Sequence, residues 1–216
     1  MTVRMPRSFP AWFLLLVAFA VQAGEKERLL FHAQPARAYP AREAHEGLVV
    51  AADPFDAPAK SSVAFGKLDF RRAGILPVLV VIANETGRAV RLDRASVQLI
   101  TRDRQKIEPM PSEEVRRRLR GGKPVSSAGG RSPSPVPRIP GRGSSKDSAI
   151  EVQVHEFAMR MVLPNSSASG FFYFDVGRGR DWVAGSKIYL TDLYWADTSK
   201  PLMFFEVGLD DAILKK

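Results

Sequence analysis

The chain has 216 residues, 45% of them hydrophobic, and a formal net charge of +9 at pH 7. That length supports the core of a globular domain, and the absence of cysteine excludes disulfides, a cysteine nucleophile and a lipid anchor attached through a thiol. The charge is uneven, because nine cations and no acid lie between residues 116 and 146. The basic character therefore belongs to one segment and not to the whole folded body.

The N-terminus has the pattern of a secretory leader. Two arginines precede an apolar run over residues 11–21, and the run closes on Val-Gln-Ala, with small residues at alternate positions. The run is shorter than the roughly 20 apolar residues of a membrane-spanning helix. We therefore predict a signal peptide over residues 1–23, cleaved between Ala23 and Gly24, and an exported protein that is periplasmic or secreted. An uncleaved N-terminal anchor is the alternative.

The next part of the chain has weaker signals. Residues 24–46 are polar, contain scattered prolines and show no sustained period, so we expect a loosely ordered arm. Gly47–Ala52 is a short apolar run that ends at the turn signal Asp53-Pro54, and it predicts a first strand. Val63–Phe70 alternates weakly, which predicts a second strand paired with the first, with Gly66 as a bulge or a close approach.

The stretch from residue 74 to residue 101 contains the clearest strand signals. Val78–Ile82 has no polar position and predicts a central strand covered on both faces. Asn84–Gly87 supplies turn residues at its end. Apolar and polar residues alternate in Val90–Asp93 and again in Ser96–Leu99, which predicts antiparallel strands with one buried face.

A short helix and a long insert are predicted next. Ser112 can cap a helix whose first turn holds two acids and whose last turn, up to Arg120, is cationic. Gly121-Gly122 ends it. Residues 121–148 contain six glycines, five prolines, seven serines and no aromatic residue. Such a composition buries too little apolar surface to offset its ordering entropy, so we expect a disordered insert.

Beyond the insert, short apolar segments alternate with turn signals. The predicted strands are residues 149–154, 170–176, 186–193 and 202–209. The last two are expected to pair as a hairpin. Residues 157–163 fit either a strand or a short helix, and residues 210–216 are expected to form a tail.

Roughly seven to nine short antiparallel strands separated by turns predict a mainly all-β protein. We expect a single immunoglobulin-like antiparallel β-sandwich over residues 47–209, with one short helix and the long disordered insert. The order VLVVIANETGRAVRLDRASVQLIT and then LPNSSASGFFYFDV resembles the immunoglobulin-like domains of bacterial exported proteins. The block from ADPFD through FGKLDFRRAGILPVLVVI is similar to an uncharacterised family of bacterial envelope proteins. The resemblance covers residues 47–209 without the insert and implies the fold, with no active site to carry over.

Aromatic residues suggest one candidate surface. In residues 170–176, one set of alternating side chains faces the core, which leaves Phe171 and Tyr173 on the opposite face. Tyr189 and Phe204 are expected to join them. Four aromatic side chains on an outer face are either covered by the chain's own arm or helix, or form a partner-binding surface.

The cationic segment has two interpretations. It is either a hydrated helix face or, with the insert, an arm that binds an anionic polymer or an anionic membrane surface. Sequence-specific nucleic-acid binding is not expected, because aromatic stacking residues and a recognition fold are missing. The candidate polyanion-binding residues are Arg116, Arg117, Arg118, Arg120, Lys123, Arg131, Arg138, Arg142 and Lys146.

Signals for catalysis and cofactors are weak. The three histidines are far apart in sequence, and no G-x-S-x-G motif is present. His45-Glu46 with Asp53 and Asp56 has ligand chemistry for a metal, but turn formation and solvated charge are the simpler interpretation. We therefore predict no cofactor and a non-catalytic exported protein that binds or scaffolds an envelope component, either a protein or an anionic surface. A hydrolase or a metal-dependent enzyme with an unrecognised site is the alternative.

Overall fold

The computed structural model describes residues 31–121, 151–178 and 182–213. The predicted signal peptide and its cleavage site lie outside these residues, as does the predicted insert beyond Gly121. Within the described residues the protein is mainly β, as the sequence predicted, with several short helices.

Eleven strands in the described residues form three sheets, and all neighbouring strands are antiparallel. The strands are β1 (Arg42–His45), β2 (Leu48–Pro54), β3 (Ile75–Asn84), β4 (Val90–Arg91), β5 (Ser96–Ile100), β6 (Lys106–Ile107), β7 (Met161–Val162), β8 (Ser166–Asp175), β9 (Lys187–Thr191), β10 (Tyr194–Trp195) and β11 (Phe205–Gly208). We call β1-β2-β3-β8 sheet A, β10-β4-β7 sheet B and β11-β9-β5-β6 sheet C.

Strand β3 is the centre of sheet A, between β2 and β8. Eight of its ten residues in succession are buried, from Ile75 to Ile82. Leu76, Val78, Val80 and Ile82 face one hydrophobic cluster, whereas Ile75, Leu79 and Val81 face a second cluster. The prediction of a central strand covered on both faces is therefore confirmed. The apolar run has no polar position because neither face of the strand meets water.

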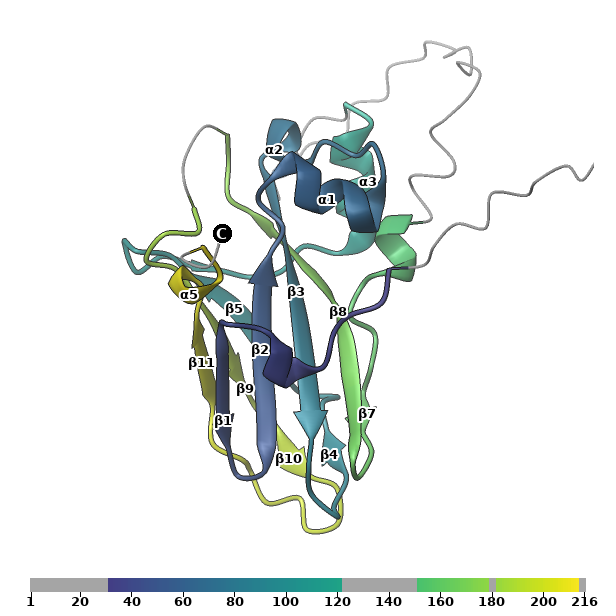
Figure 1. The fold of residues 1–216 in the computed structure, drawn as a ribbon, viewed down its shortest axis with the longest axis vertical. Helices are drawn as coiled ribbons and strands as arrows, with labels where there is room; N and C mark the ends of the chain where they lie inside the picture. Colours follow the sequence, from purple (N-terminus) through teal and green to yellow (C-terminus); the bar gives the residue numbers. More distant parts are fainter. Residues whose placement is uncertain (1–30, 122–150, 179–181, 214–216) are drawn as a thin grey trace, which may run out of the picture. The chain divides into compact units, whose positions relative to one another are not determined.

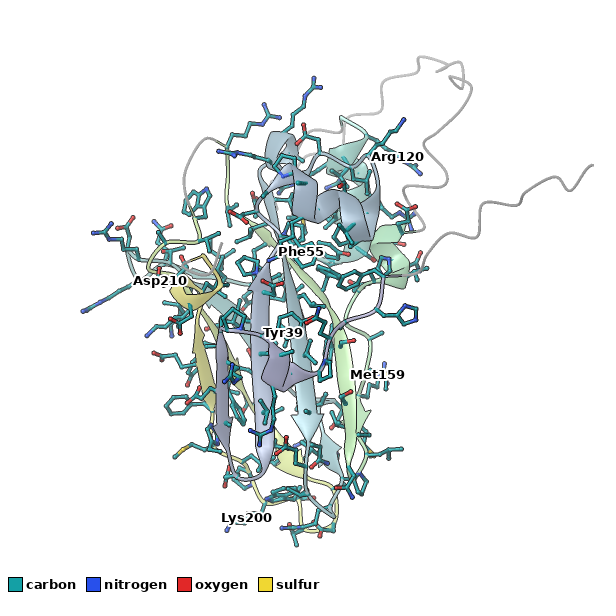
Figure 2. The ribbon with its side chains drawn as sticks, viewed as in Figure 1. Tyr39, Phe55, Arg120, Met159, Lys200 and Asp210 are labelled. Carbon is teal, nitrogen blue, oxygen red and sulfur yellow. The ribbon has the colours of Figure 1, made fainter. Side chains whose placement is uncertain are left out.

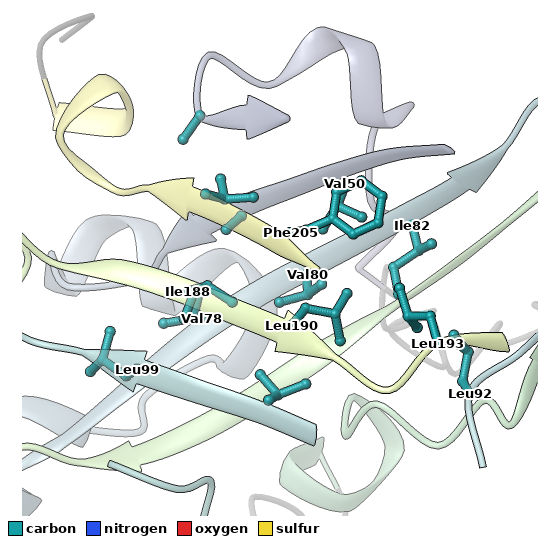
Figure 3. Packing of buried hydrophobic residues seen from close by; sticks show 14 of the residues in the cluster. Val50, Val78, Val80, Ile82, Leu92, Leu99, Ile188, Leu190, Leu193 and Phe205 are labelled. Atoms are coloured by element: carbon teal, nitrogen blue, oxygen red, sulfur yellow. The ribbon is translucent and has the colours of Figure 1, made fainter. Parts of the chain in front are cut away.

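The first cluster lies between sheets A and C. Residues Val78 and Val80 of β3 meet side chains from β5, β9 and β11 across this space (Figure 3). In β5 and β9, buried and half-buried positions alternate strictly, because only one face of sheet C is covered. The strands predicted at 96–99, 186–193 and 202–209 are confirmed, and β9 pairs with β11 as expected. The connection is not a simple hairpin, because β10 lies between them in sequence and pairs with β4.

The second cluster lies between the other face of sheet A and short helices (Figure 1). These helices are η1 (Ala36–Ala38), α1 (Pro58–Phe65), α2 (Phe70–Ala73) and α3 (Ser112–Leu119), and residues 151–154 are also helical. A further helix, α5, spans Asp210–Ile213. The prediction of one short helix is therefore wrong.

The strand predicted at Val63–Phe70 is wrong, because this segment contains the end of α1 and the start of α2. Helix α1 begins with Pro58 in its first turn but has no side-chain cap, so the usual start signal is weak. Gly66, predicted as a bulge, follows the helix with a φ of +62° and ends it. A weak alternation over eight residues did not distinguish the period of a strand from that of a helix.

The strand predicted at residues 149–154 is also wrong for its described part, which is helical from 151 to 154. Val152 is fully buried whereas Val154 is 60% exposed. Residues two apart share a face in a strand but lie on nearly opposite sides of a helix. Of the ambiguous residues 157–163, only Met161–Val162 are a strand.

The two ends of the described region are more ordered than predicted. The arm expected at 24–46 is wrong for residues 31–46, because Arg42–His45 form β1 and pair with β2. Ala36 and Tyr39 are buried in the second cluster. The tail expected at 210–216 is wrong for residues 210–213, which form α5. There, the Asp210 carboxylate accepts a hydrogen bond from the Gly185 N–H at 2.7 Å.

Helix α3 occurs where it was predicted and ends before Gly121, which has a φ of +81°. The role assigned to Ser112 is wrong, because Pro111 is the N-cap and the Ser112 side chain makes no cap. Instead, the Glu156 carboxylate accepts the Ser112 N–H at 3.0 Å. A tertiary contact thus satisfies one of the free amides at the start of α3, where the sequence predicted a local side-chain cap.

Candidate functional site

Helices α1, α2 and α3 and the helical residues 151–154 gather over sheet A near the start of β3 (Figure 1). We call these four segments the helical cap. Figure 2 shows Phe55 beneath it and Arg120 on its outer side, with Lys200 at the opposite end of the sheets. The cap therefore combines an aromatic interior with a charged exterior.

The interior of the cap is a cluster of aromatic rings. The ring of Phe171 lies 4.6 Å from that of Phe65 and 4.8 Å from that of Phe55, both edge-on. The Tyr173 hydroxyl donates a hydrogen bond to the Val152 carbonyl oxygen at 2.8 Å. Burial raises the pKa of Tyr173, so this hydroxyl remains a donor. These contacts attach the cap to β8.

The predicted aromatic surface divides into two separate places. Phe171 and Tyr173 are 1% and 0% exposed, so they do not form a partner-binding surface. For these two residues, the cover comes from the chain's own arm and helices, which was the other interpretation. Tyr189 and Phe204 lie in and beside sheet C, with ring centres 5.3 Å apart, and Phe204 is 45% exposed.

The arginines of α3 make contacts within the protein. The Arg116 guanidinium donates to the Gln153 side-chain oxygen at 2.9 Å, which joins α3 to the helical residues 151–154. Arg117 and Arg118 both pair with Glu114. The hydrogen bond from Arg117 is the main reason that the pKa of Glu114 is lowered. These contacts tie the arginines to neighbouring side chains at the surface of the cap.

Arg118 also connects α3 to sheet A. Its guanidinium lies 2.8 Å from the Asp175 carboxylate at the end of β8, and this contact raises the pKa of Arg118. Arg120 is exposed at the end of the helix. The remaining predicted polyanion-binding residues, Lys123, Arg131, Arg138, Arg142 and Lys146, lie outside the described residues.

The pairing of β3 with β8 brings two further segments together. The Asp69 carboxylate accepts the Arg72 N–H at 2.9 Å and caps α2. Gly74 then ends α2 with a φ of +72°. Its carbonyl oxygen accepts the N–H groups of Val176 and Gly177, at 3.0 and 3.1 Å. The chain that leaves β8 therefore lies directly beside α2.

A cationic pocket results at this junction, with a volume of about 440 Å³. Its charged lining residues are Lys67, Arg72, Arg118, Arg120, Arg178 and Asp69. The lining thus has five cations and one acid, although Arg118 is also paired with Glu114 and Asp175. The Asp69 carboxylate keeps its negative charge while it caps α2, so it offsets one of these positive charges and an excess of cations remains. Clustered guanidinium and ammonium groups are suited to carboxylate, sulfate or phosphate groups.

An apolar pocket of about 620 Å³ adjoins the cationic pocket, since residues 67–69 line both. It lies between the α1–α2 segment and the chain that follows β8. Its apolar lining residues include Phe55, Leu68, Phe70, Ile75, Leu76, Val176, Trp182 and Val183. The polar residues Ser62, Lys67 and Arg71 lie at its exposed rim.

His45 has a structural role at the edges of sheets A and C. Its ring stacks on Phe205 at 3.8 Å, and its Nε2 lies 3.0 Å from the Phe204 carbonyl oxygen. The carboxylates of Glu43 and Glu46 accept the backbone N–H groups of Glu206 and Met203. These side chains therefore join β1 to the β11 segment.

The other proposed metal ligands are not assembled with His45. Asp53 forms an ion pair with Lys60, and Asp56 lines the apolar pocket. In the part of the chain that the structure describes, no group of three histidine or acidic residues is arranged to hold a metal ion. His155 packs against Phe31, Phe65 and Phe171. Neither His45 nor His155 lines the cationic or the apolar pocket.

Most of the cationic pocket was missed from sequence. Lys67, Arg72 and Arg178 come from segments that carry no charge cluster as dense as that of α3. The only available signal was that each lies close to an end of β3 or β8. Predicting the pairing Ile75↔Asp175 would have placed them side by side.

Comparisons with known proteins give no relative. No protein-family model matches the chain, and no curated protein or solved structure is significantly similar to it. Among the described residues, no helix is long and apolar enough to cross a membrane.

Proposed function

We propose that the protein is a non-catalytic, exported binding or scaffolding protein of the bacterial cell envelope, and that its helical cap binds an anionic ligand. The observation that carries this proposal is the cationic pocket, in which five cations face one acid. The described side chains of Lys67, Arg72 and Arg178 are exposed or at the pocket rim, where they can reach an incoming anionic group. Export rests on the predicted signal peptide at residues 1–23.

We also propose that sheets A and C are the two layers of an immunoglobulin-like sandwich. Supporting this, both sheets are antiparallel and share one hydrophobic cluster. The resemblance of residues 47–209 to exported immunoglobulin-like domains is consistent with it. In such domains a rigid sandwich commonly carries its binding residues at one end, which is where the helical cap lies.

The proposal is tested by binding to heparin, a soluble polyanion. We expect the exported protein to be retained on a heparin column and to elute with salt, because polyanion binding is dominated by counterion release. Replacing Lys67, Arg72 and Arg178 together with Gln should lower the salt concentration needed for elution. Arg72 contributes its backbone N–H to the Asp69 cap, so the side-chain change leaves that contact in place.

The matched control removes the same charge elsewhere. Arg94, Lys106 and Lys200 are exposed cations outside the cap, and their replacement with Gln gives the same net charge. Equal elution of the two triple variants would contradict a specific cationic site. A third variant, with Gln at Lys123, Arg131, Arg138, Arg142 and Lys146, measures the contribution of the cationic segment beyond Gly121. Detection of Met1 in the exported protein by mass spectrometry would contradict the predicted processing.

A further inference from the structure

The apolar and cationic pockets are neighbours, because residues 67–69 line both. The apolar pocket, at about 620 Å³, lies in the size range of small-molecule sites, roughly 300–1,000 Å³. Phe70, Ile75 and Leu76 form part of its buried wall, with exposures of 2–4%. A ligand that fills this space would extend toward residues 67–69 and meet the cations there.

We propose that the helical cap binds a single-chain anionic amphiphile, with its apolar body in the apolar pocket and its carboxylate or phosphate group in the cationic pocket. This inference rests on the proposed function and names the ligand class. The charge distribution supports it: Lys67 and Arg71 balance Asp56 and Asp69 around the apolar pocket, whereas the cationic pocket has a large excess of positive charge. An anionic group is therefore favoured at one end of the site only.

The hydroxyl groups of the apolar pocket are already engaged within the protein. The Ser61 hydroxyl donates to the Phe55 carbonyl oxygen at 2.8 Å, and the Ser62 hydroxyl donates to the Ala59 carbonyl oxygen at 2.7 Å. Because these hydroxyl groups already donate within the protein, they do not require hydrogen-bond acceptors on the ligand body. An acyl chain or a ring thus suits this pocket better than a sugar or a peptide backbone, which would lose hydrogen bonds to water on entry.

Calorimetric titration of the full mature chain tests the inference, with dodecyl phosphate as the probe. Inorganic phosphate supplies the head group alone, and dodecyltrimethylammonium supplies the chain with the opposite charge. We expect dodecyl phosphate to bind at least about tenfold more tightly than either, because only this probe satisfies both pockets. Equal binding of dodecyl phosphate and inorganic phosphate would overturn the inference.

Two substitutions on α1 test the location of the chain. Ser62 is exposed and lines the apolar pocket, so Ser62→Phe should narrow the pocket and weaken dodecyl phosphate binding by about tenfold or more. Val63 is 70% exposed and does not line the pocket, so Val63→Phe is the matched control. Unchanged binding by Ser62→Phe, or equal losses in both variants, would overturn the inference.

Heparin retention of the same variants separates the two proposals. Ser62→Phe should elute from heparin like the unmodified protein, since it leaves the cationic pocket intact. Retention on heparin without binding of dodecyl phosphate would refute the amphiphile and leave the proposed function standing. If the variant with Gln at Lys67, Arg72 and Arg178 keeps both heparin retention and dodecyl phosphate binding, both proposals are refuted. The protein is also tested for binding to vesicles of anionic phospholipid. If it binds them and Ser62→Phe does not weaken this binding, the contact involves the head group alone, and the inference is overturned.

Discussion

Gly170 in β8 is a position with no room for a side chain. A Cβ atom added there would lie 2.5 Å from the Phe157 Cα and 2.8 Å from the Phe157 amide nitrogen. Carbon atoms in favourable contact are about 3.5–4.0 Å apart. The Phe157 segment is held against β8 by two hydrogen bonds, from the Phe171 N–H to the His155 carbonyl oxygen at 2.7 Å and from the Phe157 N–H to the Phe171 carbonyl oxygen at 3.1 Å.

The substitution Gly170→Ala requires the Phe157 backbone to move away by about 1 Å. Such a shift takes the longer hydrogen bond out of range and costs about 0.5–1.5 kcal/mol. Overpacking of a well-filled site adds about 1–3 kcal/mol. We therefore expect Gly170→Ala to lower the free energy of unfolding by about 2–4 kcal/mol.

Urea unfolding followed by circular dichroism measures this change. The control is Gly208→Ala in β11, where an added Cβ atom meets no atom within 4 Å. We expect the control to change the free energy of unfolding by less than about 0.5 kcal/mol. If Gly170→Ala is as stable as the control, the Phe157 backbone is not packed against Gly170, and the contact described here is incorrect.

Two other side chains, the half-buried His155 and the buried Asn84, give predictions of a different kind. Burial is the main cause of the lowered pKa of His155 in the folded protein, so protonation favours the unfolded state. The neutral His155 makes its full contribution to the free energy of unfolding above the ordinary pKa of 6.5, and this contribution is lost as the pH falls toward the lower pKa of the folded state. In urea titrations, the unmodified protein should thus lose stability relative to His155→Phe between about pH 7 and pH 5. A pH-independent difference between the two proteins would contradict this. The Asn84 amide donates to the Arg88 and Leu163 carbonyl oxygens, at 2.6 and 3.1 Å, and is 1% exposed. Asn84→Ala removes these two hydrogen bonds and also the acceptor of the Thr86 N–H, which donates to the Asn84 side-chain oxygen at 3.1 Å. It should cost at least about 2 kcal/mol in the same assay, so a cost below about 0.5 kcal/mol would show that water replaces the amide.

Strands with strong local signals were predicted correctly from the sequence. The uninterrupted run Val78–Ile82 required cover on both faces, and β3 has it, from sheet C on one side and from the helices on the other. In β5, Val97 and Leu99 alternate with polar residues, and this pattern defined both the strand and its buried face. The side-chain period of a strand depends only on its backbone, so it is visible before any tertiary contact is known.

Where a short segment has an ambiguous period, tertiary contacts determine whether it is a helix or a strand. Helix α1 has no side-chain cap, and α3 receives the Glu156 carboxylate at its first turn in place of a local cap. Val152 and Val154 fit a strand by alternation, yet the second cluster covers only Val152. Isolated helices this short are marginal in water, so packing on sheet A, and not propensity, selects them.

The charged site shows the same division. The sequence by itself determined that α3 is cationic, because the arginines are consecutive or nearly so. Only the tertiary structure decided that Arg118 pairs with Asp175 and that Arg72 and Arg178 line a common pocket. Those two residues are separated by more than a hundred positions, and the antiparallel pairing of β3 with β8 brings them together. Strand partners are selected by the packing of the whole sheet, which no local pattern encodes.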